Sequence, residues 1–123
     1  MSKTSKEFDF RKPVAYHAEA KRLFHSRVRS QLRRIATALG LEHGSYDLRS
    51  NQAGIAVSGE ITLHGDHLYV QVSQSATGHH SGVLFRTCEG RKDYVGGPNS
   101  FASLDLLNRP DELAHWIRGV CHV

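Results

Sequence analysis

The fold of this chain is set by the stretch Ile55–Gln74, IAVSGEITLHGDHLYVQVSQ, in which apolar and polar residues alternate on both sides of a glycine. Such alternation is typical of a β-strand with one buried face. Gly65-Asp66 has the composition of a two-residue turn, so the pattern predicts a β-hairpin. The predicted register opposes His64 to His67, Leu63 to Leu68, Thr62 to Tyr69, Ile61 to Val70 and Glu60 to Gln71.

A long amphipathic helix is predicted before the hairpin, from Val14 to Leu39, where apolar residues recur every three or four positions. Pro13 suits the first turn of a helix, and Gly40 suits its C-terminal end. The apolar stripe of this helix consists of Tyr16, Ala20, Leu23, Phe24, Val28, Leu32, Ile35 and Leu39.

Further strands and a second helix are predicted around the hairpin. The strands are expected near Tyr46–Arg49, at Val83–Cys88 and at Asp93–Val95. In the second of these, Val83 and Phe85 are predicted to face the core, and the alternative is that Leu84 and Cys88 face it. The final helix is expected after Asn108, a favourable N-cap residue, with Pro110 in its first turn. Its apolar face consists of Leu113, Trp116, Ile117, Val120 and Cys121.

This order of elements predicts a two-layer α+β domain. A long N-terminal helix and a C-terminal helix flank an antiparallel sheet of three to five strands, and both helices have an apolar stripe that can cover one sheet face. The predicted domain spans residues 13–123. Residues 1–12 are charged and polar and are predicted to form a flexible arm.

The composition favours a cytoplasmic protein. The 123 residues are enough for one domain with a core. No apolar run reaches the ~20 residues of a membrane-spanning helix, and the N-terminus lacks the apolar region of a signal peptide. Cys88 and Cys121 do not form a disulfide framework and are expected to be reduced.

Charge is distributed unevenly along the chain. Residues 1–34 hold ten Lys or Arg and three Asp or Glu, whereas residues 35–123 hold six and nine. This asymmetry favours an anionic partner for the first third of the chain. Self-association of the basic end with the acidic body is an alternative, and so is a soluble surface without a partner.

The basic residues of the long helix are the main candidate binding site. Arg22, Arg29 and Arg33 fall opposite the apolar stripe at 100° per residue, and Arg27 and Arg34 fall on one flank. Arginine pairs with phosphate through a planar fork of donors, which predicts binding of DNA or RNA. A solvated helix face and an acidic protein partner are the alternatives. The predicted nucleic-acid- or anion-binding residues are Lys21, Arg22, Arg27, Arg29, Arg33 and Arg34.

The polar face of the hairpin is a second candidate surface. Tyr69, Gln71, His64 and His67 are predicted to lie on it. Sheets that bind single strands stack bases on exposed aromatic rings, so Tyr69 is a candidate stacking residue. The alternatives are a solvated face and a face covered by a helix.

The sequence supports a metal site or a catalytic site less than it supports a binding surface. His64 faces His67 in the predicted register, and His79-His80 follow in the next loop, but no Cys or carboxylate joins them at a short fixed spacing. We therefore expect no metal site and no cofactor. Cys88 is expected to be a buried strand residue, because no motif of a cysteine enzyme surrounds it.

Two resemblances add to this reading. The order of elements resembles the α-β-β-β-α topology of double-stranded RNA-binding domains. The final helix begins Pro110-Asp111-Glu112, which is acidic where those domains are basic, so none of their binding residues is carried over. The stretches GEITLHGDHLYVQVSQ (Gly59–Gln74) and TCEGRKDYVGG (Thr87–Gly97) resemble small uncharacterised proteins of proteobacterial plasmids and integrative elements.

The sequence thus predicts a small non-enzymatic binding protein that binds nucleic acid through its basic helix. One alternative is a protein-binding accessory or inhibitor protein of a bacterial mobile element, including a homodimer formed through the long helix. A second alternative is a small metal protein or enzyme that uses histidines or Cys88.

Overall fold

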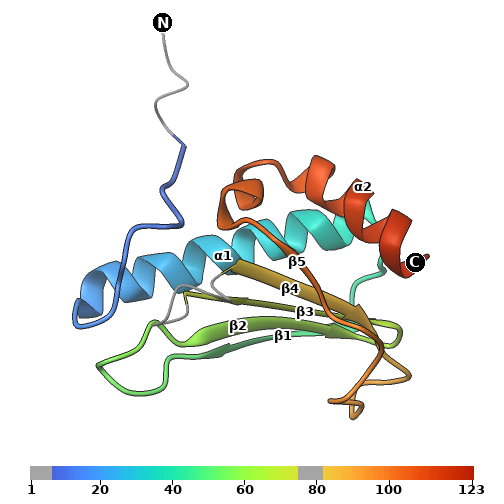
Figure 1. Ribbon diagram of the computed structural model, residues 1–123, viewed down its shortest axis with the longest axis horizontal. Helices are drawn as coiled ribbons and strands as arrows, with labels where there is room; N and C mark the ends of the chain where they lie inside the picture. The colour runs from blue at the N-terminus through green and yellow to red at the C-terminus, as the bar shows by residue number, and fades with distance from the viewer. Residues whose placement is uncertain (1–6, 75–81) are drawn as a thin grey trace, which may run out of the picture.

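The computed structural model describes residues 7–74 and 82–123. It has the expected α+β architecture, with an N-terminal helix, a five-stranded antiparallel sheet and a C-terminal helix (Figure 1). The elements are α1 (Ala18–Ala38), β1 (Tyr46–Asn51), β2 (Glu60–Gly65), β3 (Leu68–Ser73), β4 (Gly82–Thr87), β5 (Ser100–Ala102), the 3-10 helix η2 (Leu104–Asn108) and α2 (Pro110–Cys121).

The strands follow one another in the sheet in sequence order, from β1 at one edge to β5 at the other. Both helices lie on the same face of the sheet, and α2 packs against α1 (Figure 1). The other face carries no helix among the described residues, and we call it the helix-free face. The molecule is therefore a two-layer domain with one covered sheet face.

The central hairpin is present, but its predicted register is wrong by two positions. Leu63 pairs with Val70 and His64 with Tyr69, so Asp66-His67 form the turn. Gly65 is a buried strand residue without positive φ, and the main chain of the segment before β1 approaches it closely. A shift of two positions leaves every side chain on its predicted face, because strand side chains alternate with period two.

The core lies between the two helices and the sheet, where the apolar side chains of the strands face the helices. Leu63, Val70 and Phe85 pair across β2, β3 and β4 and are fully buried. The predicted core residues Val83 and Phe85 are confirmed. Alpha1 contributes Phe24, Val28, Leu32 and Ile35, and α2 contributes Leu113 and Ile117.

Alpha1 begins later than predicted. Pro13 does not start the helix; the chain makes a turn at residues 15 and 16, and Tyr16 has a positive φ of 68°. Its N–H donates to the carbonyl of Ile55, 2.8 Å away, which holds it against the β1–β2 loop. Tyr16 and Leu23 are exposed, although both belong to the predicted stripe.

The first part of the predicted hairpin is also not a strand. Ile55 and Val57 lie in the loop between β1 and β2, and both side chains are exposed. Gly59 has φ of +77° and lies against the Asn51 carbonyl, which is where the chain turns into β2. The alternation of apolar and polar residues from Ile55 to Ser58 therefore does not correspond to the two faces of a strand.

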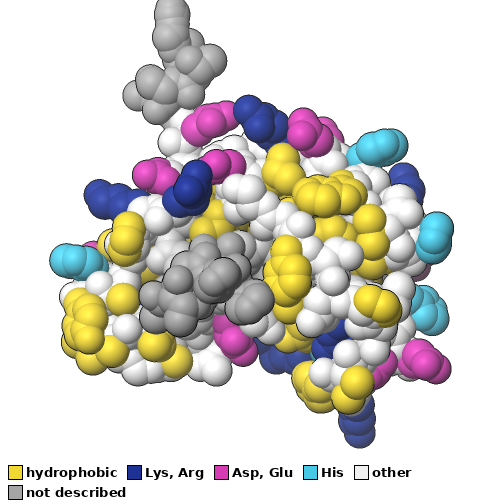
Figure 2. Space-filling view, in the orientation of Figure 1, with side chains coloured by type: hydrophobic (Ala, Val, Ile, Leu, Met, Phe, Trp, Pro, Cys, Tyr) yellow, Lys and Arg dark blue, Asp and Glu magenta, His cyan; other side chains and the backbone are white. Residues whose placement is uncertain are grey.

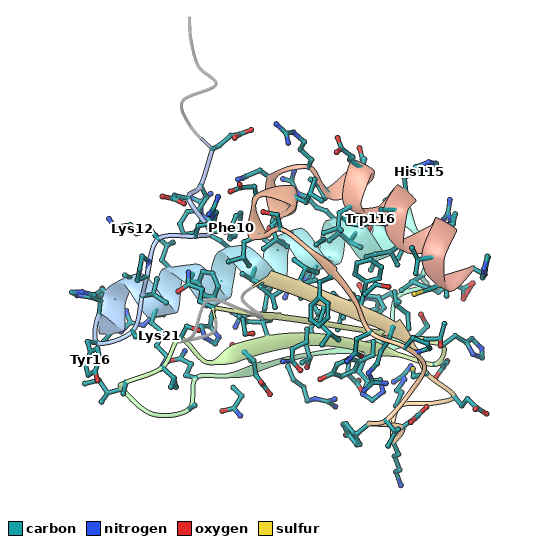
Figure 3. All side chains as sticks on the ribbon, in the orientation of Figure 1. Phe10, Lys12, Tyr16, Lys21, His115 and Trp116 are labelled. Carbon is teal, nitrogen blue, oxygen red and sulfur yellow. The ribbon has the colours of Figure 1, made fainter. Side chains whose placement is uncertain are left out.

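Packing of the chain begins before the predicted domain boundary at residue 12. Phe10 (Figure 3) is 1% exposed. Its ring packs edge-on against Phe24 of α1. The Gln74 side chain donates to the carbonyls of Phe10 and Lys12 at 2.7 and 2.9 Å. Asn108 donates to the Phe8 carbonyl, so residues 8–12 are bound to the sheet and to η2.

The C-terminal third differs from the prediction in two places. Asp93–Val95 form a loop instead of a strand, whereas residues 100–102 form the edge strand β5. Alpha2 begins at Pro110 with Arg109 at the N-cap, so Asn108 is not the cap. Trp116 and Val120, predicted on the apolar face of this helix, are about two-fifths exposed, at 42% and 43%.

Candidate nucleic-acid interface

Four of the five predicted arginines on α1 are exposed, and the fifth, Arg29, is half-buried. Arg22 forms an ion pair with Glu19 one turn earlier. Among the described residues, no carboxylate forms an ion pair with Arg27, Arg29, Arg33 or Arg34. Alpha1 therefore carries four guanidinium groups without an acidic partner.

These arginines form two separate rows on α1. Arg22, Arg29 and Arg33 recur at intervals of seven and four residues, so they lie along one side of the helix. That side adjoins β1, because His25, which lies between Arg22 and Arg29 in the same row, contacts Ser50 of β1. We call Arg22, Arg29 and Arg33 the arginine row.

Arg27 and Arg34 lie on the other side of α1, nearer to the N-terminal stretch and α2. The Arg27 guanidinium lies over the Phe8 ring, 5.4 Å from its centroid. Arg34 lines a depression of about 400 Å³ together with Arg33 and with Pro110 and Asp111 of α2. Asp111 at the start of α2 therefore lies near Arg33 and Arg34 and reduces the positive potential there.

Lys21 is not part of the basic surface, contrary to the prediction. It is 6% exposed, and its Nζ donates to the Gly54 carbonyl at 2.8 Å (Figure 3). The β1–β2 loop folds over this flank of α1, which buries the lysine stem and directs the ammonium group to a loop carbonyl. A solvent-facing phosphate cannot reach it in this arrangement.

His25 is buried beside Lys21. Its Nε2 donates to the Ser58 carbonyl at 2.8 Å, so Nδ1 accepts from the Ser50 hydroxyl group. Burial lowers the pKa of His25 below 6.5, and the charges of Lys21 and Arg29 lower it further, against the raising effect of the Ser58 carbonyl. His25 is therefore a neutral link between α1, β1 and the β1–β2 loop.

The second predicted surface, on the sheet, is largely covered. Asp47, His64, Tyr69 and Arg86 form one row across β1 to β4 on the helix-free face. His64 is fully buried and Tyr69 is 9% exposed. The Arg86 guanidinium covers the Tyr69 ring at 4.2 Å from its centroid, so this ring cannot stack on a base in the described conformation.

The other two residues predicted on this surface, Gln71 and His67, differ in their exposure. Gln71 accepts a hydrogen bond from the Tyr69 hydroxyl at 2.8 Å and is half-buried. His67 is exposed in the turn and is not opposite His64. Burial raises the pKa of Tyr69, and the Glu60 carboxylate adds to this increase.

The histidines do not form a metal site within the described residues. Both ring nitrogens of His64 have partners, since Nδ1 accepts from Arg49 at 3.1 Å and Nε2 donates to the Gly90 carbonyl at 3.0 Å. No group of three His, Cys, Asp or Glu residues in residues 7–74 and 82–123 is arranged to hold a metal ion. His79 and His80 lie outside the described residues.

The two cysteines are buried free thiols. Cys88 donates from Sγ to the Gly65 carbonyl at 3.3 Å, as expected for a packed strand-end residue. Burial raises the pKa of the Cys121 thiol, which disfavours the reactive thiolate. Neither position has the features of a nucleophile.

A depression of about 690 Å³ lies at the end of the sheet near the start of β2. Small apolar and neutral polar side chains line it, with Arg11 and Glu60 as its charged members. These residues provide no arrangement of acid, base and nucleophile. The residues that line this depression therefore do not indicate a reaction.

Sequence reasoning missed Arg49 and Arg86, which the fold brings to the helix-free face. The signal for Arg86 was present, because it alternates with Phe85 in a strand whose Phe85 was predicted to face the core. Its position beside Tyr69 depends on the β3–β4 register, which the hairpin alone does not determine.

No family model, no curated protein and no solved structure matches this chain. The described helices include none that combines the length and the apolar character required to cross a membrane.

Proposed function

We propose that this protein binds nucleic acid without catalysing a reaction, and that the arginine row of α1 contacts the phosphate backbone. The observation that carries the proposal is that Arg29 and Arg33 of this row have no carboxylate partner among the described residues; Arg22 pairs only with the exposed Glu19 on the same helix. Cations that are not neutralised within the protein attract anions, and arginine suits phosphate because it donates two parallel hydrogen bonds.

The length of the row supports a polyanionic partner. Eleven residues separate Arg22 from Arg33, which corresponds to about 16 Å along a helix axis. A nucleic-acid strand presents a phosphate about every 3.4 Å along the duplex axis, so it can contact all three guanidinium groups at once. A single small anion would contact only one or two of them.

The resemblance of Gly59–Gln74 and Thr87–Gly97 to proteins of plasmids and integrative elements is consistent with this proposal. A small nucleic-acid-binding protein on such an element would act as an accessory factor in a bacterial cytoplasm. This part of the proposal rests on the resemblance alone and stays a prediction.

The test is fluorescence anisotropy with labelled single- and double-stranded DNA and RNA over a series of salt concentrations. The variant Arg29→Gln/Arg33→Gln removes two positive charges from the arginine row. Lys92→Gln/Arg109→Gln removes the same charge from exposed positions outside α1 and serves as the matched control.

We expect the affinity of the wild type for nucleic acid to fall steeply as the salt concentration rises. At a given salt concentration, the arginine-row variant should bind more weakly than the wild type. Each phosphate contact contributes about −0.9 to the slope of log K against log salt for duplex DNA, so the variant should lose about 1.8 from the slope. The control should keep the wild-type slope. Equal loss in both variants would mean that net charge, and not the arginine row, determines binding.

A second candidate function, binding of a protein partner, is favoured by one specific feature. Tyr16, Ile55 and Val57 are exposed apolar residues, and the Tyr16 N–H donates to the Ile55 carbonyl where the β1–β2 loop passes the start of α1. Hydrophobic side chains gather at the lower left of Figure 2, over the region of this loop. Tyr16 also has the strained positive φ noted above, which is uncommon for an aromatic residue. Exposed aromatic residues are common anchors of protein interfaces.

The protein-binding candidate makes a separate prediction. A tagged wild-type chain should retain one specific protein from a bacterial lysate treated with nuclease, and Tyr16→Ser/Ile55→Ser should not retain it. Retention of the same protein by both chains, or of none by the wild type, would count against this candidate. The nucleic-acid measurement is unaffected by either outcome.

A further inference from the structure

Arg86 is the most unusual charged residue of the helix-free face. It lies on β4 in the same row as Tyr69 and His64, and it is 5% exposed. Its guanidinium group stacks on the Tyr69 ring, which provides a cation–π contact. A cation buried to this extent is normally paired with an anion or fully hydrogen-bonded.

Within the described part of the chain, Arg86 has no anionic partner, and one of its nitrogens has no hydrogen bond. Its Nη1 is buried and makes no hydrogen bond, and no carboxylate forms an ion pair with it. Asp93 is close enough to interact electrostatically with Arg86, but its oxygens accept hydrogen bonds from the backbone N–H groups of Glu89, Val95 and Gly96. The buried Nη1 group of Arg86 can therefore donate a hydrogen bond to an anionic acceptor.

The loop of residues 89–97 covers this side chain closely. Gly96 has φ of +61°, and a Cβ atom at this position would collide with Arg86 Nη1 and with the Thr87 carbonyl. The glycine thus lets the backbone lie directly on the guanidinium group without offering it an acceptor. Only a glycine permits both the positive φ and this approach.

The loop is held unevenly. Its first part is fixed by Arg91, which pairs with Asp47 and Asp66 and donates to the Gly44 carbonyl, and by His64, which donates to the Gly90 carbonyl at 3.0 Å. Its second part contacts the sheet through the Gly97 N–H, which donates to the Thr87 carbonyl at 3.1 Å, and through the Tyr94 ring, which packs edge-on against His64. The side chains of Tyr94 and Val95 are 62% and 85% exposed. A loop with few buried apolar contacts opens at a low cost in free energy.

Both cations and carboxylates lie near the row that contains Arg86. Arg49 approaches the same row from β1 and donates to His64 Nδ1, which leaves other guanidinium donors of Arg49 directed elsewhere. Asp47 interacts with Arg91 and, at 4.0 Å, with Arg49, and Asp66 interacts with Arg91. Asp47, Asp66 and Asp93 are thus engaged by other arginines or by the loop backbone. Among the described residues no carboxylate, Glu60 included, forms an ion pair with Arg86.

We propose that Arg86 anchors a binding site for an oxyanion, a phosphate or carboxylate group, on the helix-free face beneath the loop of residues 89–97, with Arg49 as a second cation. The anion accepts from Nη1 once Gly96 moves away from it. This site is separate from the arginine row on α1, and it does not depend on nucleic-acid binding there.

The experiment is a titration of the ¹⁵N-labelled full chain, followed by NMR, with sodium phosphate in one arm and sodium acetate in the other. Sodium chloride at matched ionic strength gives the baseline. We expect saturable shifts of the Gly96 and Gly97 amide signals with phosphate, acetate or both. A response to only one probe identifies the kind of group that the site takes.

Arg86→Gln should abolish the saturable shifts, and Lys92→Gln, which removes an exposed cation from the same loop, should retain them. The absence of a saturable response to both probes in the wild type would overturn the proposal, as would an unchanged response in Arg86→Gln.

If Arg86→Gln does not fold, Arg86→Lys provides the second test. Lysine keeps the positive charge and loses the planar fork of donors, so we expect affinity to fall by about tenfold or more, the effect of one lost charge-assisted hydrogen bond. An unchanged affinity in this variant would show that Arg86 does not contact the anion.

Discussion

Lys21 of α1 donates a hydrogen bond from Nζ to the carbonyl of Gly54 in the β1–β2 loop, at 2.8 Å, and is itself almost completely buried. A lysine in a basic helix is therefore a structural link between two segments and not a surface charge. The distinction matters because Lys21 and the arginine row are close in sequence but have different roles.

The first prediction follows from this link. Lys21→Gln should destabilise the fold by about 1–3 kcal/mol, because the loop carbonyl loses a charged donor and a buried polar group remains. The salt slope of nucleic-acid binding should not change. Denaturant unfolding and anisotropy measure the two effects; a change of slope with no loss of stability would place Lys21 at the interface after all.

The second prediction concerns pH and His25. Its folded-state pKa is lowered, mainly by burial, so the unfolded chain binds more protons between that value and 6.5. The stability contributed by neutral His25 is present above pH 6.5 and is lost as the pH falls toward the folded-state pKa. Thermal unfolding measured from pH 8 to pH 5 should show this decrease in stability in the wild type and a smaller decrease in His25→Gln. Equal decreases in the two proteins would exclude His25 as the cause.

The third prediction tests the loop over Arg86. Gly96→Ala should destabilise the native state by more than about 1 kcal/mol, because the new Cβ meets the Arg86 guanidinium and a backbone carbonyl at a positive φ. Gly119→Ala is the control: nothing lies within 4 Å of its added Cβ, and alanine favours a helix by about 0.5–1 kcal/mol. Equal unfolding midpoints for the two variants would contradict the described loop position.

The fourth prediction tests the packing of the N-terminal stretch. Phe10→Ala should cost about 3–5 kcal/mol, as for other large core side chains, since Phe10 is 1% exposed. Lys12→Ala, two residues away and exposed, should change stability by less than about 0.5 kcal/mol. If both substitutions have small effects, residues 8–12 are not bound to the domain in solution.

Alternation of side chains was enough to predict the fold class and the faces of the central hairpin. Leu63 and Val70 face the core because period-two patterning assigns a face to each residue whatever the register. The register itself was not determined, because Gly65-Asp66 and Asp66-His67 both make acceptable two-residue turns and differ by a shift that leaves the faces unchanged.

The buried polar residues were harder to predict. Helical periodicity places Lys21 and His25 at the edge of the apolar stripe, and only the path of the β1–β2 loop decides that they are covered. Likewise, Arg86 and Tyr69 are seventeen positions apart, and the connection between their strands runs through residues 75–81, so their contact could not be derived from local pattern. Long-range packing, and not propensity, placed these groups.

The central claim is that the arginine row on α1 binds the phosphate backbone, and the most direct measurement is the salt dependence of nucleic-acid affinity in two charge-matched variants. The account predicts that Arg29→Gln/Arg33→Gln has a shallower slope of log K against log salt than Lys92→Gln/Arg109→Gln, by about 1.8 for duplex DNA. Identical slopes, or no binding of the wild type to any probe at low salt, would contradict it.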